Sequence, residues 1–191
     1  MLQSAKNEIV PMRRLMLWRH AKTETDAPSG QDHDRRLDER GRRDAAEMGS
    51  WIGRHPPFPD LVLVSTAVRA QQTWDLGWQA MKDRIPAPKV EHVDELYGAE
   101  PTELLKIVRL AEARDPKQLM LVGHNPGMHE LAMILAGSGD KAARKAIEDN
   151  LPTAGLAILD FDTDDWTDIG FRRGKLAQFV SPKLLRQGSG D

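Results

Sequence analysis

The 191-residue sequence contains no cysteine. This absence excludes disulfide bonds, catalysis by a thiolate, and zinc or iron–sulfur sites built on cysteine. It is also typical of a protein that works in a reducing compartment. The first residues lack the apolar core and the small-residue cleavage site of a secretory signal, so we expect a cytoplasmic protein.

Long apolar runs and a dominant charge are missing as well. No run approaches the roughly 20 apolar residues that a helix needs to span a bilayer. The 27 basic and 29 acidic residues give a net charge of −2, which provides no general attraction to nucleic acid. We therefore predict no membrane partner and no nucleic-acid partner. The sequence does not indicate the oligomeric state.

Several site types are absent too. There is no phosphate-cradling glycine loop of the Walker type and no acidic cluster resembling a magnesium site. The histidines at positions 33, 55, 92 and 129 show no metal-ligand spacing. The prediction is a protein that uses neither a metal nor a cofactor.

The composition nevertheless supports a compact core. Apolar residues make up 40% of the chain, and the length is close to that of one domain. No internal repeat or low-complexity linker divides the chain. We predict an N-terminal tail over 1–12, a single domain over 13–182 and a C-terminal tail over 183–191.

Short apolar runs alternate with helical patterns along this domain. Strand-length runs occur at Leu15–Trp18, Leu61–Val64, Leu119–Val122 and Leu156–Leu159. Apolar stripes with helical spacing cover residues 37–52, 67–81, 104–111 and 128–135. Strands that alternate with helices predict an α/β fold, a three-layer α/β/α sandwich with a mostly parallel central sheet.

Basic and imidazole side chains follow three of the predicted strands. The first strand leads into Arg19-His20, the second into Ser65-Thr66 with Arg69 close behind, and the third into Gly123-His124. In such sheets ligands bind beyond the carboxyl ends of the strands, so these side chains are expected to meet at one edge.

The predicted helix starts favour an anion at that edge. Asn125 is a good N-cap and Pro126 a good first helical residue, which places His124 just before a helix N-terminus. Thr66 resembles an N-cap, which would put Arg69 in the first turn of its helix. Arginines bind tetrahedral dianions by paired hydrogen bonds, and a neutral imidazole nitrogen is a competent nucleophile toward phosphorus. The residues therefore predict metal-free phosphoryl transfer through histidine.

The segments around these residues resemble the motifs of the histidine phosphatase superfamily, which has the phosphoglycerate mutase-like fold. The first motif matches Arg19-His20-Ala21, with Ala21 where glycine is usual; the later motifs match residues 64–73 and 121–126, in the expected order. The spacing Arg35…Leu37…Gly41 and the tripeptide Pro152-Thr153-Ala154 are similar to the compact SixA-type branch of phosphohistidine phosphatases, which lacks a large cap.

The resemblance implies a role for each matching residue. His20 takes the phosphoryl group, and Arg19, Arg69 and His124 complete the catalytic phosphate pocket. Arg35 adds a further substrate contact, although Arg36 replaces a proline that is usual beside it. Relatives that cleave esters use an acid between the second and third motifs, and Glu95 is the matching carboxylate here.

A mutase is a further alternative, but mutases of this superfamily usually carry longer insertions that cover the pocket, and 191 residues leave little room for one. Three other functions remain open from the sequence. The first is a cofactor-independent phosphatase acting on phosphohistidine in a protein, because an imidazole leaving group needs less help from an acid than an alkoxide does. The second is a phosphomonoester phosphatase on a small phosphate ester, which needs Glu95 as its acid. The third, of another class, is a non-catalytic phosphate-binding regulatory module.

Overall fold

A seven-stranded sheet forms the centre of the protein. The computed structural model describes residues 12–188, and its strands lie in the order β3-β2-β4-β1-β6-β7-β5. The strands are β1 (Arg13–Arg19), β2 (Leu61–Ser65), β3 (Lys89–Val93), β4 (Gln118–Gly123), β5 (Ala136–Gly139), β6 (Leu156–Phe161) and β7 (Gly174–Val180). All neighbouring strands pair in parallel except β6, which is antiparallel to both β1 and β7.

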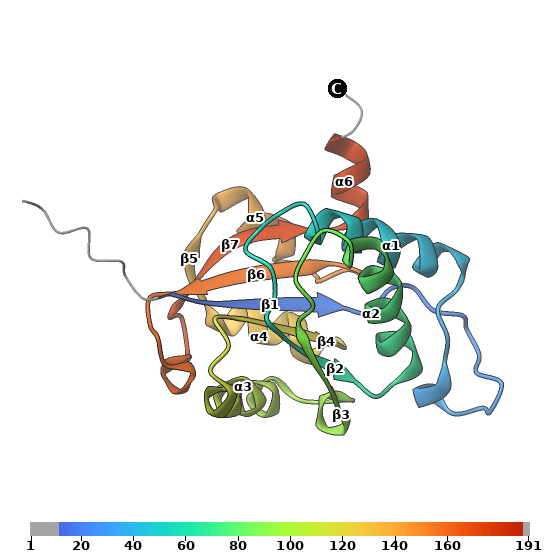
Figure 1. Ribbon diagram of the computed structural model, residues 1–191, viewed down its shortest axis with the longest axis horizontal. Helices are drawn as coiled ribbons and strands as arrows, with labels where there is room; N and C mark the ends of the chain where they lie inside the picture. Colours follow the sequence, from blue (N-terminus) through green and yellow to red (C-terminus); the bar gives the residue numbers. More distant parts are fainter. Residues whose placement is uncertain (1–11, 189–191) are drawn as a thin grey trace, which may run out of the picture.

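Helices cover both faces of this sheet (Figure 1). One face packs against α1 (Glu39–Ile52), α2 (Val68–Met81) and α6 (Pro182–Gly188), and the other against α3 (Pro101–Leu110), α4 (Gly127–Leu135) and α5 (Lys141–Ile147). Four short 3-10 helices occupy the connections: η1 (Asp32–Asp34), η2 (Asp94–Leu96), η3 (Ala111–Arg114) and η4 (Trp166–Asp168). The predicted three-layer α/β architecture with a mostly parallel sheet is confirmed.

Burial explains why the central strands read as continuous apolar runs. Every residue of β2 is buried, because helices cover both of its faces. Alternate residues of β1 then supply two separate cores, with Leu15 and Leu17 on the α3–α4 side and Met16 and Trp18 on the α1–α2 side. Because the side chains within the central strands are used in the two cores, only residues beyond the strand ends can face a ligand.

The two helices nearest the predicted site pack closely against each other. A Cβ atom added to Gly49 of α1 would lie 2.3 Å from the carbonyl oxygen of Gly77 in α2. Only glycine at this crossing allows the backbones to approach so closely. The contact fixes α2, and with it the side chain of Arg69 in its first turn.

The structure corrects the predicted C-terminal tail. Residues through 188 continue as α6, whose Arg186 pairs with the buried Asp44 and with Glu47, while Leu185 packs against the core. The sequence also missed β3, β5 and β7, which are edge or outer strands without a continuous apolar run. The predicted tail 1–12 lies outside the described residues apart from Met12.

Two further properties concern the described chain as a whole. Between residues 12 and 188, no helix combines the length and apolar character that crossing a membrane requires. In the same range, no inserted domain covers the edge of the sheet where β1, β2 and β4 end.

Candidate active site

Three strand ends meet at one edge of the sheet, as predicted. Arg19 at the end of β1 is in register with Gly123 at the end of β4, and Val64 near the end of β2 is in register with Val122. The backbone N–H of His20 continues the pairing by donating to the carbonyl of Gly123 at 3.0 Å. The imidazole rings of His20 and His124 consequently lie with centroids 5.2 Å apart.

His20 is held as a neutral imidazole with one nitrogen committed. Its Nδ1 lies 2.8 Å from the carbonyl oxygen of Ala21, which can only accept, so Nδ1 carries the hydrogen and Nε2 keeps its lone pair. Burial lowers the pKa of His20 to about 4, with Arg69 and Arg19 acting in the same direction. Near neutral pH the ring therefore presents an unprotonated Nε2.

A short hydrogen-bond chain ties His20 to the helix that carries Arg69. The N–H of Ala21 donates to the hydroxyl of Thr73 at 2.9 Å, and that hydroxyl donates to the carbonyl of Arg69 at 2.7 Å. Thr73 is fully buried, so both bonds are shielded from water. This tether sets the position of the first turn of α2 relative to the imidazole.

The backbone of the 149–155 segment holds Arg19 from the other side. Its Nη1 donates to the carbonyl of Leu151 at 2.9 Å, and burial lowers the pKa of the guanidinium. The same carbonyl accepts a hydrogen bond from the Asn125 amide, which follows His124. The segment before β6 thus joins the ends of β1 and β4.

His124 pairs with Ser65, a residue that sequence reasoning left without a role. The Nε2 atom of His124 and Oγ of Ser65 are 2.7 Å apart, and this oxygen already accepts the N–H of Ala67. Burial lowers the pKa of His124 to about 3, with His20 and Arg69 adding to the effect, so this ring is neutral too.

Asp32 is the main residue that the sequence analysis missed. Its carboxylate accepts hydrogen bonds from Nη2 of Arg69 at 2.9 Å, Nε of Arg35 at 3.0 Å and the hydroxyl of Tyr97 at 2.8 Å. Its carbonyl accepts from Nη1 of Arg69 at 2.7 Å. The Tyr97 hydroxyl and the arginines lower the pKa of Asp32, so this carboxyl stays ionised and is no proton donor.

Tyr97 lies against His124, His33 and Arg69. Its ring meets that of His124 edge to face at 5.5 Å and that of His33 at 4.9 Å, and the Arg69 guanidinium carbon lies 5.7 Å from the ring centroid. The Asp32 carboxylate raises the pKa of the Tyr97 phenol, which therefore remains a hydrogen-bond donor. No sequence pattern separates Tyr97 from its exposed neighbours.

Arg35 and Glu95 differ in how close they come to this cluster. Arg35 joins it through Asp32 and through Oγ1 of Thr23 at 2.8 Å, and its charge also lowers the pKa of His20. Glu95 lies exposed in η2 and lines a cavity of about 650 Å³ between η2 and α3, whose lining also includes Tyr97. Its carboxylate makes no hydrogen bond or ion pair with any residue between 12 and 188.

The two predicted helix caps are wrong in detail. Helix α4 begins at Gly127 rather than Pro126, because the Asn125 amide binds Asn150 and Leu151 instead of capping. The residue before α2 is Ala67 and not Thr66, whose hydroxyl bonds His33 at 3.2 Å. Arg69 still lies in the first turn of its helix.

Unpaired buried polar atoms gather at this edge. Five buried side-chain nitrogen or oxygen atoms between residues 12 and 188 lack a hydrogen-bond partner, and four of them belong to Arg19, Arg69, His124 and Asn125. Buried polar groups are almost always paired in folded proteins, so such a concentration marks a site that binds a polar ligand. With several guanidinium groups around neutral rings, the arrangement suits an anion.

Metal-ligand groupings are not found in the part of the chain that the structure describes. No three histidine, aspartate or glutamate side chains among residues 12–188 come together as a metal ion requires.

This chain resembles known proteins in both sequence and structure. The model of the histidine phosphatase superfamily (branch 1) matches residues 15–100. An uncharacterised protein of Mycobacterium tuberculosis is 39% identical over 169 residues, which cover 86% of this chain and 99% of the relative. The structure of a provisionally named phosphohistidine phosphatase SixA from Agrobacterium tumefaciens superposes with a TM-score of 0.73 at 31% identity, covering 89% of this chain and 98% of that one. A provisionally named SixA from Nakamurella multipartitia gives a TM-score of 0.75 at 28% identity, with 90% and 96% covered.

Proposed function

Because this chain belongs to the histidine phosphatase superfamily, in its SixA-type branch, and is a phosphatase, we propose that it hydrolyses phosphohistidine in a protein through a phosphoenzyme on His20. The observation that carries the proposal is the state of His20, a buried neutral ring whose Nδ1–H is bound and whose Nε2 is free. A phosphorus nucleophile needs this protonation state at neutral pH.

In the first step, Nε2 of His20 attacks phosphorus in line. The new N–P bond forms as the bond from phosphorus to the substrate's imidazole nitrogen breaks, and that imidazole leaves with a proton from solvent. Arg19 and Arg69 neutralise the equatorial oxygens, whose charge must be balanced throughout the transfer. In the second step, the oxygen of a water molecule bonds to phosphorus as the N–P bond to His20 breaks, and the protons of that water pass to phosphate and solvent. Inorganic phosphate is released, and His20 regains its lone pair.

His124 and Ser65 act together in this scheme. A phosphate oxygen accepts hydrogen bonds, so binding favours the tautomer in which the Ser65 hydroxyl donates to Nε2 and Nδ1 of His124 carries the hydrogen. Arg35 adds positive charge near the phosphate pocket, where its hydrogen bond to Asp32 holds it.

The carboxylates at the site favour a phosphoramidate over an ester. Asp32 is kept ionised by Tyr97 and the arginines and cannot protonate a leaving group. Glu95 contacts none of the four phosphate-pocket residues. An alkoxide needs a proton in order to leave, whereas a phosphohistidine ring that has taken a proton from solvent on its other nitrogen leaves as neutral imidazole, whose conjugate acid has a pKa near 6.5.

The test is metal-free phosphate release from a phosphohistidine protein, a phosphoserine peptide and a sugar phosphate. We expect turnover of the first substrate, no turnover with His20→Ala, and an acid-labile phosphoenzyme trapped with wild-type protein. Preference for the sugar phosphate would replace this proposal with an ester phosphatase. Vanadate binding without any turnover would replace it with the phosphate-binding module.

A further inference from the structure

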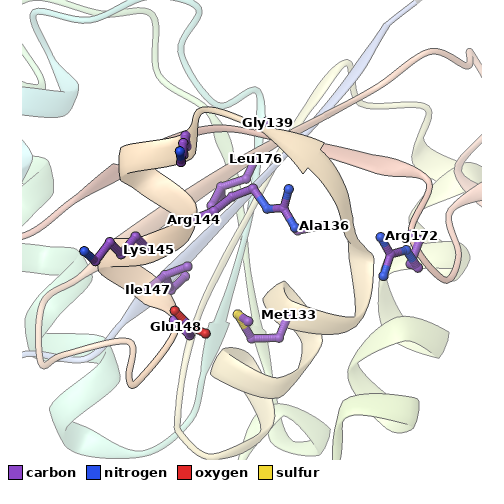
Figure 2. A pocket seen from close by; sticks show the side chains of 10 residues that line it. Met133, Ala136, Gly139, Arg144, Lys145, Ile147, Glu148, Arg172 and Leu176 are labelled. Carbon is purple, nitrogen blue, oxygen red and sulfur yellow. The ribbon is translucent and has the colours of Figure 1, made fainter.

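A large cavity away from the catalytic edge lies between α4 and α5. It has a volume of about 710 Å³ and is walled by the end of α4, by β5, by α5 and by the start of β7. Figure 2 shows Arg144 and Lys145 projecting from α5 on one side, Met133 from α4 below, and Arg172 on the opposite side. No step of the proposed hydrolysis uses these residues.

The lining of this cavity is strongly positive. Four cationic side chains face a single anionic one, Glu148; the four are Lys141, Arg144, Lys145 and Arg172. All four are exposed, and none forms an ion pair with a residue between 12 and 188. The chain as a whole is slightly acidic, so a net excess of three positive charges here is local and complements an acidic partner.

Arg172 occupies a backbone position that normally favours glycine. Its φ angle is 56°, in the left-handed region, and its N–H donates to the carbonyl of Ile134 at 2.9 Å. Gly137 makes the close approach possible, because a Cβ there would lie 1.8 Å from the carbonyl oxygen of Arg172. A left-handed non-glycine residue costs on the order of 1 kcal/mol, so an arginine at this position is a candidate for a binding role.

Apolar groups border the charges. Met133, which lines the cavity, is 41% exposed. Buried Ile147 and Leu176 form the floor of the cavity. A cationic rim beside an exposed thioether group is typical of a surface that binds protein rather than a lone inorganic anion.

The cavity reaches the catalytic edge through a short stretch of chain. Glu148, in its wall, is three residues before Leu151, whose carbonyl holds Arg19, and three residues span at most roughly 11 Å. The carbonyl of Ile147 is 2.8 Å from Nε2 of His129 in α4, which anchors the end of α5 beside the helix that follows His124. A protein bound at His20 can therefore extend over α5.

We propose that this cavity docks an acidic segment of the phosphorylated protein substrate, a role that rests on the function proposed above. The partner segment would place carboxylates against Arg144, Lys145 and Arg172 and an apolar side chain beside Met133. Docking of this kind contributes equally to the ground state and the transition state, so it lowers KM without changing kcat.

The test compares two substrates on the same full-length enzyme: free phosphohistidine and an acidic protein phosphorylated on histidine by phosphoramidate. With Arg144→Glu/Lys145→Glu we expect KM for the protein to rise about tenfold, kcat to stay the same, and both constants for free phosphohistidine to stay the same. The difference should shrink as ionic strength rises.

Two further variants serve as a second probe of the cavity and as a control for net charge. Arg172→Gly removes a cation while suiting the left-handed backbone, so it should fold and raise KM for the protein about threefold. Arg54→Glu/Lys82→Glu changes the net charge as much as the α5 double variant, but at exposed positions on the α1–α2 side, and should leave KM unaltered.

The outcomes separate this proposal from the function on which it rests. An unchanged KM for the protein, or an equal loss on free phosphohistidine, overturns the docking role and leaves the phosphatase proposal intact. Hydrolysis of free phosphohistidine by wild type, with none of the phosphoprotein, overturns both. An equal rise in KM with the Arg54/Lys82 control would mean that general charge, not this cavity, attracts the substrate, and overturns the docking role.

Discussion

The carboxylate of Asp32 lies 2.9 Å from Nη2 of Arg69, and the backbone carbonyl of Asp32 binds the other terminal nitrogen of the same guanidinium at 2.7 Å. Arg69 is 5% exposed, whereas the Asp32 side chain is 54% exposed. A solvent-facing acid therefore orients a buried phosphate-binding cation. Two opposite effects follow, since the acid positions Arg69 and its charge also repels the phosphate.

Asp32→Asn decides between these effects. A hydrogen bond to a charged group is worth about 1.5–3 kcal/mol, whereas solvent screens the repulsion from an exposed carboxylate. We therefore expect positioning to dominate and kcat/KM to fall roughly tenfold or more, with kcat affected more than KM. Steady-state kinetics on phosphohistidine protein measures the split.

Asp34→Asn is the matched control. Asp34 lies two residues away in η1, and its carboxylate bonds Ser29 and approaches His33, with no arginine in contact. Its removal should leave both constants within about twofold of wild type, in line with an exposed surface charge. A gain in activity with Asp32→Asn would show instead that the repulsion dominates.

Ser65→Ala tests the pairing that orients His124. Without the hydroxyl, Nε2 of the buried ring loses its partner at 2.7 Å, and an unsatisfied buried polar group costs about 1–3 kcal/mol. We expect kcat to drop about tenfold, with a modest loss of stability. Ser181→Ala is the comparison, because that buried hydroxyl caps α6 at Leu184 and its loss should lower stability without lowering kcat.

The two buried histidines make stability depend on pH. Their pKa values are about 4 for His20 and about 3 for His124 in the folded protein, against about 6.5 in an unfolded chain. Between about pH 6.5 and pH 4 the unfolded chain binds protons that the folded protein does not, so the free energy of unfolding falls as the pH falls. At about pH 5 the two groups together lower it by up to about 4 kcal/mol relative to pH 7.5.

Urea unfolding at several pH values measures this dependence. His124→Gln removes one of the two titrating groups and should roughly halve the loss between pH 7.5 and pH 5, whatever its own effect on stability. His92→Asn, on the exposed face of β3, controls for removing a histidine as such. Identical pH slopes in wild type and His124→Gln would contradict the assignment.

The sequence predicted the parts of the site that lie on the polypeptide immediately after buried strands. Arg19, His20 and His124 follow apolar runs whose burial and parallel pairing leave little choice of position. Asp32 and Tyr97 come from η1 and η2, and their meeting at 2.8 Å depends on loop paths that no local pattern encodes. The sequence did not predict the outer strands for a related reason, since β5 consists of small residues and β3 is largely exposed.

Helix α6 is another element that local sequence patterns do not predict. Its seven residues are too few to form a stable helix alone, and its ion pairs with Asp44 and Glu47 in α1 come from far along the chain. Arg186→Ala would leave Asp44, which is 1% exposed, with only Arg40 at 3.5 Å. We expect a loss of about 1–3 kcal/mol in urea unfolding with kcat unchanged, and Lys183→Ala, on the exposed side of α6, should have little effect.

Glu95→Gln separates the two catalytic functions that the sequence left open. If the leaving group is an imidazole, the exposed carboxylate of η2 is dispensable, and kcat on the phosphohistidine protein should change less than about twofold. If the substrate is an ester, loss of the acid should lower kcat about a hundredfold or more, as removal of a general acid usually does. Asp94→Asn, the adjacent exposed carboxylate, should leave both substrates unaffected. A large loss on the phosphohistidine protein with Glu95→Gln alone would mean that η2 moves toward His20 when substrate binds, and that the leaving imidazole takes its proton from Glu95 rather than from water.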